Sequence, residues 1–165
     1  MKRLTTLILA LVFTMVCATA FAAAPTEPAS IVKVRDAKLA AAVKDIKEIQ
    51  IKDLLGMMKK KQKFVLLDIR EPAEQGFVIP AKKLVKIPRG LLEWLVWKQV
   101  KLTDNVVVYC KSGARGAFAT KLLNDLGYKK AVNLKGGIVA WLESGKPVQT
   151  YIGNIKPTGY KFPKK

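Results

Sequence analysis

A buried strand that leads into a cysteine and then a glycine-containing loop most limits how this chain can fold. The strand residues are Val106-Val107-Val108-Tyr109, and Cys110 follows them directly. The loop Lys111-Ser112-Gly113-Ala114-Arg115-Gly116 comes next, and a helical pattern then covers 117–126. This order places the thiol of Cys110 at the carboxyl end of a strand, in a loop whose backbone amides can turn inward and form a cradle for an anion.

Strand patterns and helical patterns alternate along the middle of the chain. The apolar run at 64–69 is typical of a strand that is buried on both faces. The alternation predicts an α/β domain with a central, mostly parallel sheet flanked by helices. The expected strands are 49–51, 64–69, 84–87, 106–109 and 131–133, and the expected helices are 36–46, 53–60, 72–75, 91–99, 117–126 and 139–142.

The first 22 residues are typical of a secretory signal peptide. Lys2 and Arg3 precede the apolar run 4–20, and Ala20-Phe21-Ala22 supplies small residues for cleavage after residue 22. The alternative is an uncleaved anchor, but the run is somewhat short for a span of about 20 apolar residues. Lipid attachment at Cys17 is disfavoured because no small residue precedes it. We therefore expect an exported, most plausibly periplasmic, protein with no stable membrane span after cleavage.

The rest of the chain divides into three parts by composition and spacing. Residues 23–48 are expected to form a proline-bearing linker and an N-terminal helix. Residues 49–147 contain the alternating pattern and are enough for one domain with a real core. Residues 148–165 contain Gly, Pro and Lys with little periodicity, so we expect an extended, basic C-terminal tail.

Charge and residue usage exclude several kinds of chemistry. The chain has 30 basic and 12 acidic residues, a formal net charge of +18, and no histidine. Without histidine, Ser-His-Asp and Cys-His catalysis and histidine metal sites are excluded. A single mature cysteine excludes an internal disulfide and a thiolate cluster, so no metal and no cofactor are predicted. The basic surface would steer small anions, but its scattered lysines without interleaved aromatics argue against nucleic acid.

Cys110 has two possible roles, as an inert core residue or as a reactive thiol. The loop after it favours the second role. Gly113 and Gly116 permit backbone conformations that other residues resist, and the following helix terminus adds positive potential. Lys111 and Arg115 add full positive charges, which stabilise a thiolate. We predict that Cys110 attacks an anionic donor and carries a covalent intermediate.

Three blocks of the sequence occur in a telling order. They are Leu67-Asp68-Ile69-Arg70-Glu71-Pro72-Ala73-Glu74, Cys110 to Arg115, and Leu126-Gly127-Tyr128 followed by Leu134 to Trp141. In this order they resemble the motifs D-x-R-E-x-x-E, C-x-x-G-x-R, L-G-[FY] and L-x-G-G-x-x-x-W of the single-domain rhodaneses, sulfurtransferases that carry sulfane sulfur as a cysteine persulfide. The resemblance covers roughly 49–147. It departs from the family at Gly76–Ala81, where many members have G-H-I-x-G-A and this chain lacks the histidine.

The resemblance implies a rhodanese-like fold and a thiosulfate sulfurtransferase with Cys110 as the persulfide-bearing nucleophile. Cyanide or a thiol would accept the sulfur. Asp68 and Arg70 would lie near the site, where they either support it or form a structural ion pair. Gly136-Gly137 and Trp141 are expected to serve turns and packing. The residues implied to bind a small anionic donor such as thiosulfate are Lys111, Ser112, Gly113, Ala114 and Arg115.

Two other functions stay open at this point. A C-x-x-x-x-x-R phosphatase also uses a cysteine nucleophile in an anion-binding loop, but its loop has one more residue. Here four residues separate Cys110 from Arg115, which suits a sulfur-sized centre better than a phosphoryl group. The second alternative is a non-turnover sulfur carrier or binding module, because a fold does not by itself establish turnover.

Overall fold

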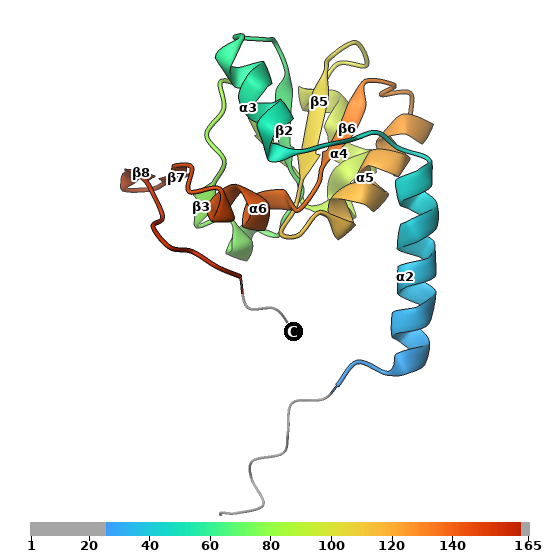
Figure 1. Cartoon of the computed structure of the whole chain (residues 1–165). Coiled ribbons are helices and arrows are strands. Elements are labelled where there is room, and N and C mark those ends of the chain that lie inside the picture. The colour runs from blue at the N-terminus through green and yellow to red at the C-terminus, as the bar shows by residue number, and fades with distance from the viewer. Residues whose placement is uncertain (1–25, 163–165) are drawn as a thin grey trace, which may run out of the picture. The chain divides into compact units, whose positions relative to one another are not determined.

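The computed structural model describes residues 26–162 (Figure 1). The chain divides into two units, Met1–Val34 and Arg35–Lys165. Helix α2 (Ala29–Lys44) begins in the first unit and ends in the second. The predicted signal peptide, 1–22, lies outside the described residues together with its cysteine. Among the residues described, no helix has both the length and the apolar character needed to span a membrane.

A parallel sheet of five strands forms the centre of the second unit, in the order β1-β6-β5-β2-β4. Every strand pair in this sheet is parallel. Parallel neighbours need crossover connections, which place helices on the faces of the sheet. The predicted α/β class with a central, mostly parallel sheet is therefore confirmed. The strands are β1 (Glu48–Ile49), β2 (Val65–Asp68), β4 (Leu84–Lys86), β5 (Val106–Tyr109) and β6 (Ala131–Leu134).

The two faces of the sheet support two apolar clusters. Along β5, Val106 and Val108 belong to one cluster, whereas Val107 and Tyr109 belong to the other, as the two-residue period of a strand requires. Cys110 shares the first cluster with Leu123 of α5. The helices and short 3₁₀ turns are α3 (Ile51–Lys59), η1 (Pro72–Glu74), η2 (Arg89–Leu91), α4 (Leu92–Gln99), α5 (Ala114–Asp125) and α6 (Gly137–Glu143).

Helix α5 begins three residues earlier than the sequence pattern predicts. Residues 114–116, which we expected in the loop, form its first turn. The cause is Gly113, whose left-handed backbone (φ +96°) turns the chain directly from the loop into the helix. At the other end, Gly127 (φ +98°) stops the helix as predicted, and the amide of Tyr128 donates to the carbonyl of Leu123 at 2.9 Å.

A second, antiparallel sheet contains part of the expected C-terminal tail. Its order is β3-β7-β8. The prediction of an extended tail is therefore wrong for the first residues of 148–165. Three-residue strands are too short to show periodicity, and the hairpin turn is held by a side chain: Thr150 Oγ1 accepts from the amide of Ile152 at 3.3 Å and donates to the carbonyl of Gly153 at 2.8 Å. The strands are β3 (Phe77–Val78), β7 (Val148–Thr150) and β8 (Gly153–Ile155).

Lys61, just after α3, carries an unfavourable backbone conformation. Its φ is +52°, the one positive value among the described residues other than glycine. Lys61→Gly should raise the free energy of unfolding by about 1 kcal/mol, because glycine adopts this conformation without steric penalty. Urea unfolding measures the change. The matched variant Lys60→Gly, at φ −77°, should lower stability instead; equal losses for both variants would contradict the argument.

Candidate active site

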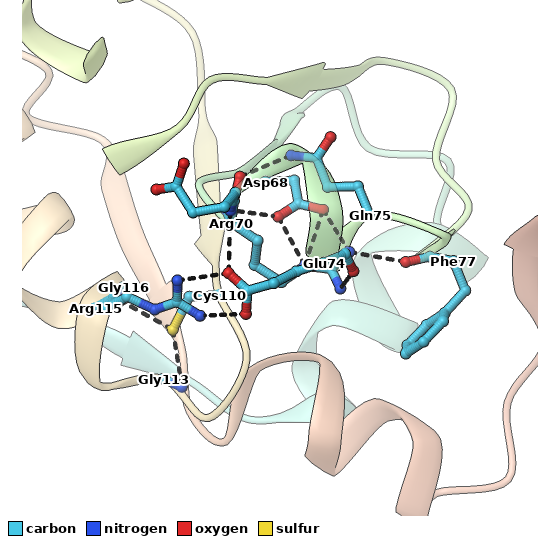
Figure 2. A network of polar contacts seen from close by, with 10 residues as sticks. Asp68, Arg70, Glu74, Gln75, Phe77, Cys110, Gly113, Arg115 and Gly116 are labelled. Atoms are coloured by element: carbon cyan, nitrogen blue, oxygen red, sulfur yellow. Dashed lines mark hydrogen bonds and ion pairs between the residues drawn. The ribbon is translucent and has the colours of Figure 1, made fainter. Parts of the chain in front are cut away.

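Cys110 follows β5 at the carboxyl edge of the sheet and is 1% exposed. Its Sγ accepts hydrogen bonds from the backbone N–H of Gly113 at 3.2 Å and of Gly116 at 3.3 Å (Figure 2). These amides lie at the start of α5, where the helix dipole adds positive potential. The predicted amide cradle is therefore present, with Gly113 and Gly116 as the donors to sulfur.

Both of these glycines stand where a side chain does not fit. A Cβ on Gly113 would lie 2.9 Å from the backbone nitrogen of Gly136, in addition to the strain of its positive φ. A Cβ on Gly116 would overlap the side-chain oxygen of Asn133 and approach Cys110 Sγ to 3.8 Å. The close packing keeps the two amides directed at the sulfur.

Helix α6 braces the back of the loop through its N-terminal amides. The N–H of Ile138 donates to the carbonyl of Cys110 at 2.9 Å, and the N–H of Val139 donates to the carbonyl of Lys111 at 3.0 Å. A Cβ on Gly137 would overlap both carbonyl oxygens. Gly136 and Gly137 therefore form the turn before α6 and let its backbone approach the carbonyls of the loop. Trp141 is buried, and its Nε1 donates to the carbonyl of Pro147 at 2.9 Å.

Arg115, in the first turn of α5, is paired with Glu74 of η1. Its Nη1 and Nη2 donate to the two carboxylate oxygens at 2.7 and 2.6 Å (Figure 2). These hydrogen bonds hold the pKa of Glu74 down at about 2 and raise the pKa of Arg115. A planar bidentate pair fixes the guanidinium beside the loop. Glu74 belongs to the acidic motif at 67–74, and nothing in that motif indicates its partner.

The ion pair should make stability depend on pH. Because folding depresses the pKa of Glu74, the pair stabilises the fold above the usual carboxyl pKa of 4.5 and loses this effect as the pH falls toward about 2. We expect Glu74→Gln to be less stable than the unmodified protein at pH 6. The difference in the free energy of unfolding between the two proteins should be smaller at pH 3. Urea unfolding at both pH values checks this; a gap that does not change with pH would contradict it.

Asp68 and Arg70 form an ion pair at the end of β2, with 0% and 2% of their side chains exposed. Arg70 Nη2 lies 2.7 Å from Asp68 Oδ2 and also donates to the carbonyl of Phe77 at 2.8 Å (Figure 2). The hydroxyl of Tyr109 donates to Asp68 Oδ2 at 2.6 Å, and burial together with this carboxylate raises the pKa of Tyr109. The geometry favours the structural ion pair over a direct role at the sulfur.

Phe77 stands where the motif G-H-I-x-G-A has a histidine that this chain lacks. The guanidinium carbon of Arg70 lies 5.6 Å from the centre of its ring, within the range of a cation–π contact. Its backbone belongs to β3, which pairs with β7. The segment that contains Phe77 is therefore held by strand pairing with β7 and by the contact of its ring with Arg70.

The remaining predicted donor-binding residues occupy the outer side of the loop. Lys111 and Ser112 are exposed, and Ala114 is half-buried at the start of α5. Lys111 Nζ lies 5.3 Å from the ring centre of Phe162, whose backbone N–H donates to Glu143 Oε1 at 3.2 Å. The end of the basic tail thus contacts the candidate site, and no sequence pattern indicated this.

Asn133 of β6 is a second residue that the sequence analysis missed. It is buried, and its Nδ2 donates to Glu48 Oε1 at 2.7 Å and to the carbonyl of Gly113 at 3.2 Å. The amide side chain thereby holds the loop residue that donates to the sulfur of Cys110. A polar residue within an otherwise apolar strand was the available signal.

Comparison with known proteins agrees with this fold. A family model for the rhodanese-like domain matches residues 50–144. The chain is 34% identical to a sulfurtransferase of Allochromatium vinosum, over 62% of this chain and 94% of that protein. The chain belongs to the rhodanese family, as the motifs predicted. These relatives support sulfur transfer as its general activity.

Two solved structures extend the comparison. The polysulfide-sulfur transferase homodimer of Wolinella succinogenes is 28% identical, with a TM-score of 0.62, and the match covers 79% of this chain and 93% of that one. A Rhodopseudomonas palustris protein described as a possible tyrosine phosphatase is also 28% identical, with a TM-score of 0.60, over 76% of this chain and 98% of that one. The fold is thus shared with a named sulfur transferase and with a protein described only as a possible phosphatase.

Proposed function

We propose that this protein transfers sulfane sulfur from thiosulfate, or a similar small anionic donor, to a thiophilic acceptor through a persulfide on Cys110. The observation that carries the proposal is the sulfur of Cys110, held by the amides of Gly113 and Gly116 at the start of a helix. Backbone donors and a helix terminus stabilise negative charge on the nucleophile and beside it. No histidine is needed for this activation.

The proposed reaction has two displacement steps. The Cys110 thiolate attacks the outer sulfur of thiosulfate, a sulfur–sulfur bond forms, and sulfite leaves with the electron pair of the broken bond. The acceptor then attacks the outer sulfur of the persulfide; with cyanide the product is thiocyanate, and the Cys110 thiolate is restored. The charges balance in each step, and no metal or other cofactor takes part.

The charged groups around the loop give the donor its class. Lys111 directly follows Cys110, and Arg115, whose guanidinium binds Glu74, lies in the first turn of α5 next to Gly116, a donor to the sulfur. Both cations favour an anionic donor, and the excess of basic over acidic residues in the chain steers anions toward the protein. The Wolinella succinogenes neighbour is named for polysulfide, so polysulfide is the second donor to test.

Mass spectrometry of the purified protein after thiosulfate treatment tests the proposal. We expect a gain of about 32 Da, one sulfur atom, on Cys110, and release of thiocyanate when cyanide is added. A gain in mass without repeated turnover would favour the sulfur carrier. Phosphate release from an aryl phosphate, with no mass gain from thiosulfate or polysulfide, would favour the phosphatase and overturn the proposal.

We also propose that the protein is exported to the periplasm after cleavage behind residue 22. The support is the basic start, the apolar run and the small residues of the N-terminal segment. Mass spectrometry of the protein from a periplasmic fraction should give a chain that begins at Ala23. A full-length chain in the membrane fraction would instead identify an uncleaved anchor.

A further inference from the structure

A hollow of about 970 Å³ lies at the amino edge of the central sheet. Its walls include Val65 at the start of β2, Lys83 just before β4 and Asn105 just before β5. Since each residue of a parallel strand advances about 3.3 Å, Asn105 and Cys110 lie roughly 16 Å apart at opposite ends of β5. The hollow is therefore separate from the candidate active site.

The inner surface of the hollow is apolar. Met58 and Phe64 are half-buried and pack against the same core cluster as Ala81, and Pro80 extends this surface. An apolar body placed here would lose contact with water, at a gain of about 25 cal/mol per Å² of apolar surface buried. The volume lies within the range of roughly 300–1,000 Å³ that is typical of sites for whole small molecules.

The rim of the hollow is basic. Lys61, Lys63 and Lys82 line it and are exposed, and within residues 26–162 none of their ammonium groups is in an ion pair. The fourth lysine, Lys83, is paired with the one lining carboxylate, Asp104, at 3.1 Å. Three lysines without an ion-pair partner in the described part of the chain lie beside an apolar surface. This combination favours a ligand that has an anionic end and an apolar body.

The C-terminal hairpin closes one side of this hollow. Gln149 of β7 and Asn154 of β8 are register partners, and both line it. Their amide groups can donate to a carboxylate. The segment that the sequence pattern left as a tail thus contributes polar walls to a cavity whose opposite side comes from α3 and β2.

We propose that this hollow binds a free organic carboxylate with an apolar body, of the medium-chain fatty acid type. The hydrocarbon lies against Met58, Phe64 and Ala81, and the carboxylate meets the ammonium groups of Lys63 and Lys82. Both parts of the hollow are used, which neither a simple inorganic anion nor a neutral hydrocarbon can do.

Titration of the ¹⁵N-labelled protein with octanoate tests the proposal without any sulfur transfer. We expect saturable amide shifts at Met58, Phe64 and Asn105, and much weaker shifts with 1-octanol, which has the same chain without the charge. Lys63→Glu combined with Lys82→Glu should weaken octanoate binding by about tenfold. The matched double variant Lys38→Glu/Lys98→Glu changes the net charge equally at two exposed residues that do not line the hollow, and it should bind octanoate as the unmodified protein does.

A second variant removes space without changing charge. Ala81→Leu should also weaken octanoate binding. Equal affinity for 1-octanol, or equal losses in the two double variants, would overturn the proposal. Sedimentation with phosphatidylglycerol vesicles distinguishes a lipid surface from the free molecule: vesicle binding through Lys63 and Lys82 without octanoate binding would also overturn it.

Discussion

Replacement of Cys110 by serine should abolish the thiosulfate-dependent mass gain and lower thiocyanate production by roughly 10³-fold or more. A hydroxyl cannot carry a persulfide, and only binding and positioning remain without the nucleophile. Serine is close in shape, so the amides of Gly113 and Gly116 still have an acceptor and the fold should persist. Mass spectrometry, a thiocyanate assay and circular dichroism measure the three quantities.

A repositioned thiol provides the control for this variant. Cys110→Ser combined with Ser112→Cys restores a cysteine two residues further on, at an exposed position of the same loop. We expect no recovery of turnover, because the amides remain directed at position 110. A mass gain in Cys110→Ser itself, or full turnover in the double variant, would contradict the role given to Cys110.

The second large effect is expected at the ion pair beneath the site. Asp68→Ala should lower the free energy of unfolding by about 3–5 kcal/mol, because it leaves a buried guanidinium without its counterion. The hydroxyl of Tyr109 loses its acceptor as well. Urea unfolding measures the stability, and the mass-gain assay measures persulfide formation. At a temperature where the Asp68→Ala variant is still folded, we expect the mass gain to persist although the free energy of unfolding is lower.

An apolar replacement of both partners is the matched control. Asp68→Leu combined with Arg70→Met removes both charges and should recover much of the stability lost in Asp68→Ala, since apolar groups of similar volume can replace a buried pair. If Asp68→Ala unfolds like the unmodified protein but loses the mass gain, Asp68 acts on the chemistry and the structural assignment is wrong.

Local patterns account for the parts of the site that the sequence predicted. The continuous run of β-branched and aromatic residues before Cys110 is typical of a strand that is buried on both faces, and in the structure all four residues of β5 are buried. Gly127, which takes a positive φ, ends α5 as the sequence predicted, whereas the start of the helix directly after Gly113 was not predicted. Strand, cysteine, turn and helix are consecutive in the chain, so their order fixed the position of the thiol.

Contacts between distant residues were not predictable in the same way. Glu74 and Arg115 are 41 residues apart in sequence, and their pairing depends on how η1 and α5 meet above the sheet. The contact of Phe162 with Lys111 and the support of Gly113 by Asn133 depend equally on tertiary packing. Strands such as β3 are too short to have a periodic signal and form only because β7 provides a partner.

The hydrogen bonds between α6 and the loop separate the shape of the loop from the identity of its exposed side chains. Because Ile138 and Val139 bind the carbonyls of Cys110 and Lys111 through main-chain atoms, the loop's shape is set independently of its outward side chains. Positions 111, 112 and 114 can therefore be exchanged while the sulfur keeps its surroundings. We therefore expect substitutions at these positions to alter the preference for a sulfur donor without moving the amides that surround Cys110.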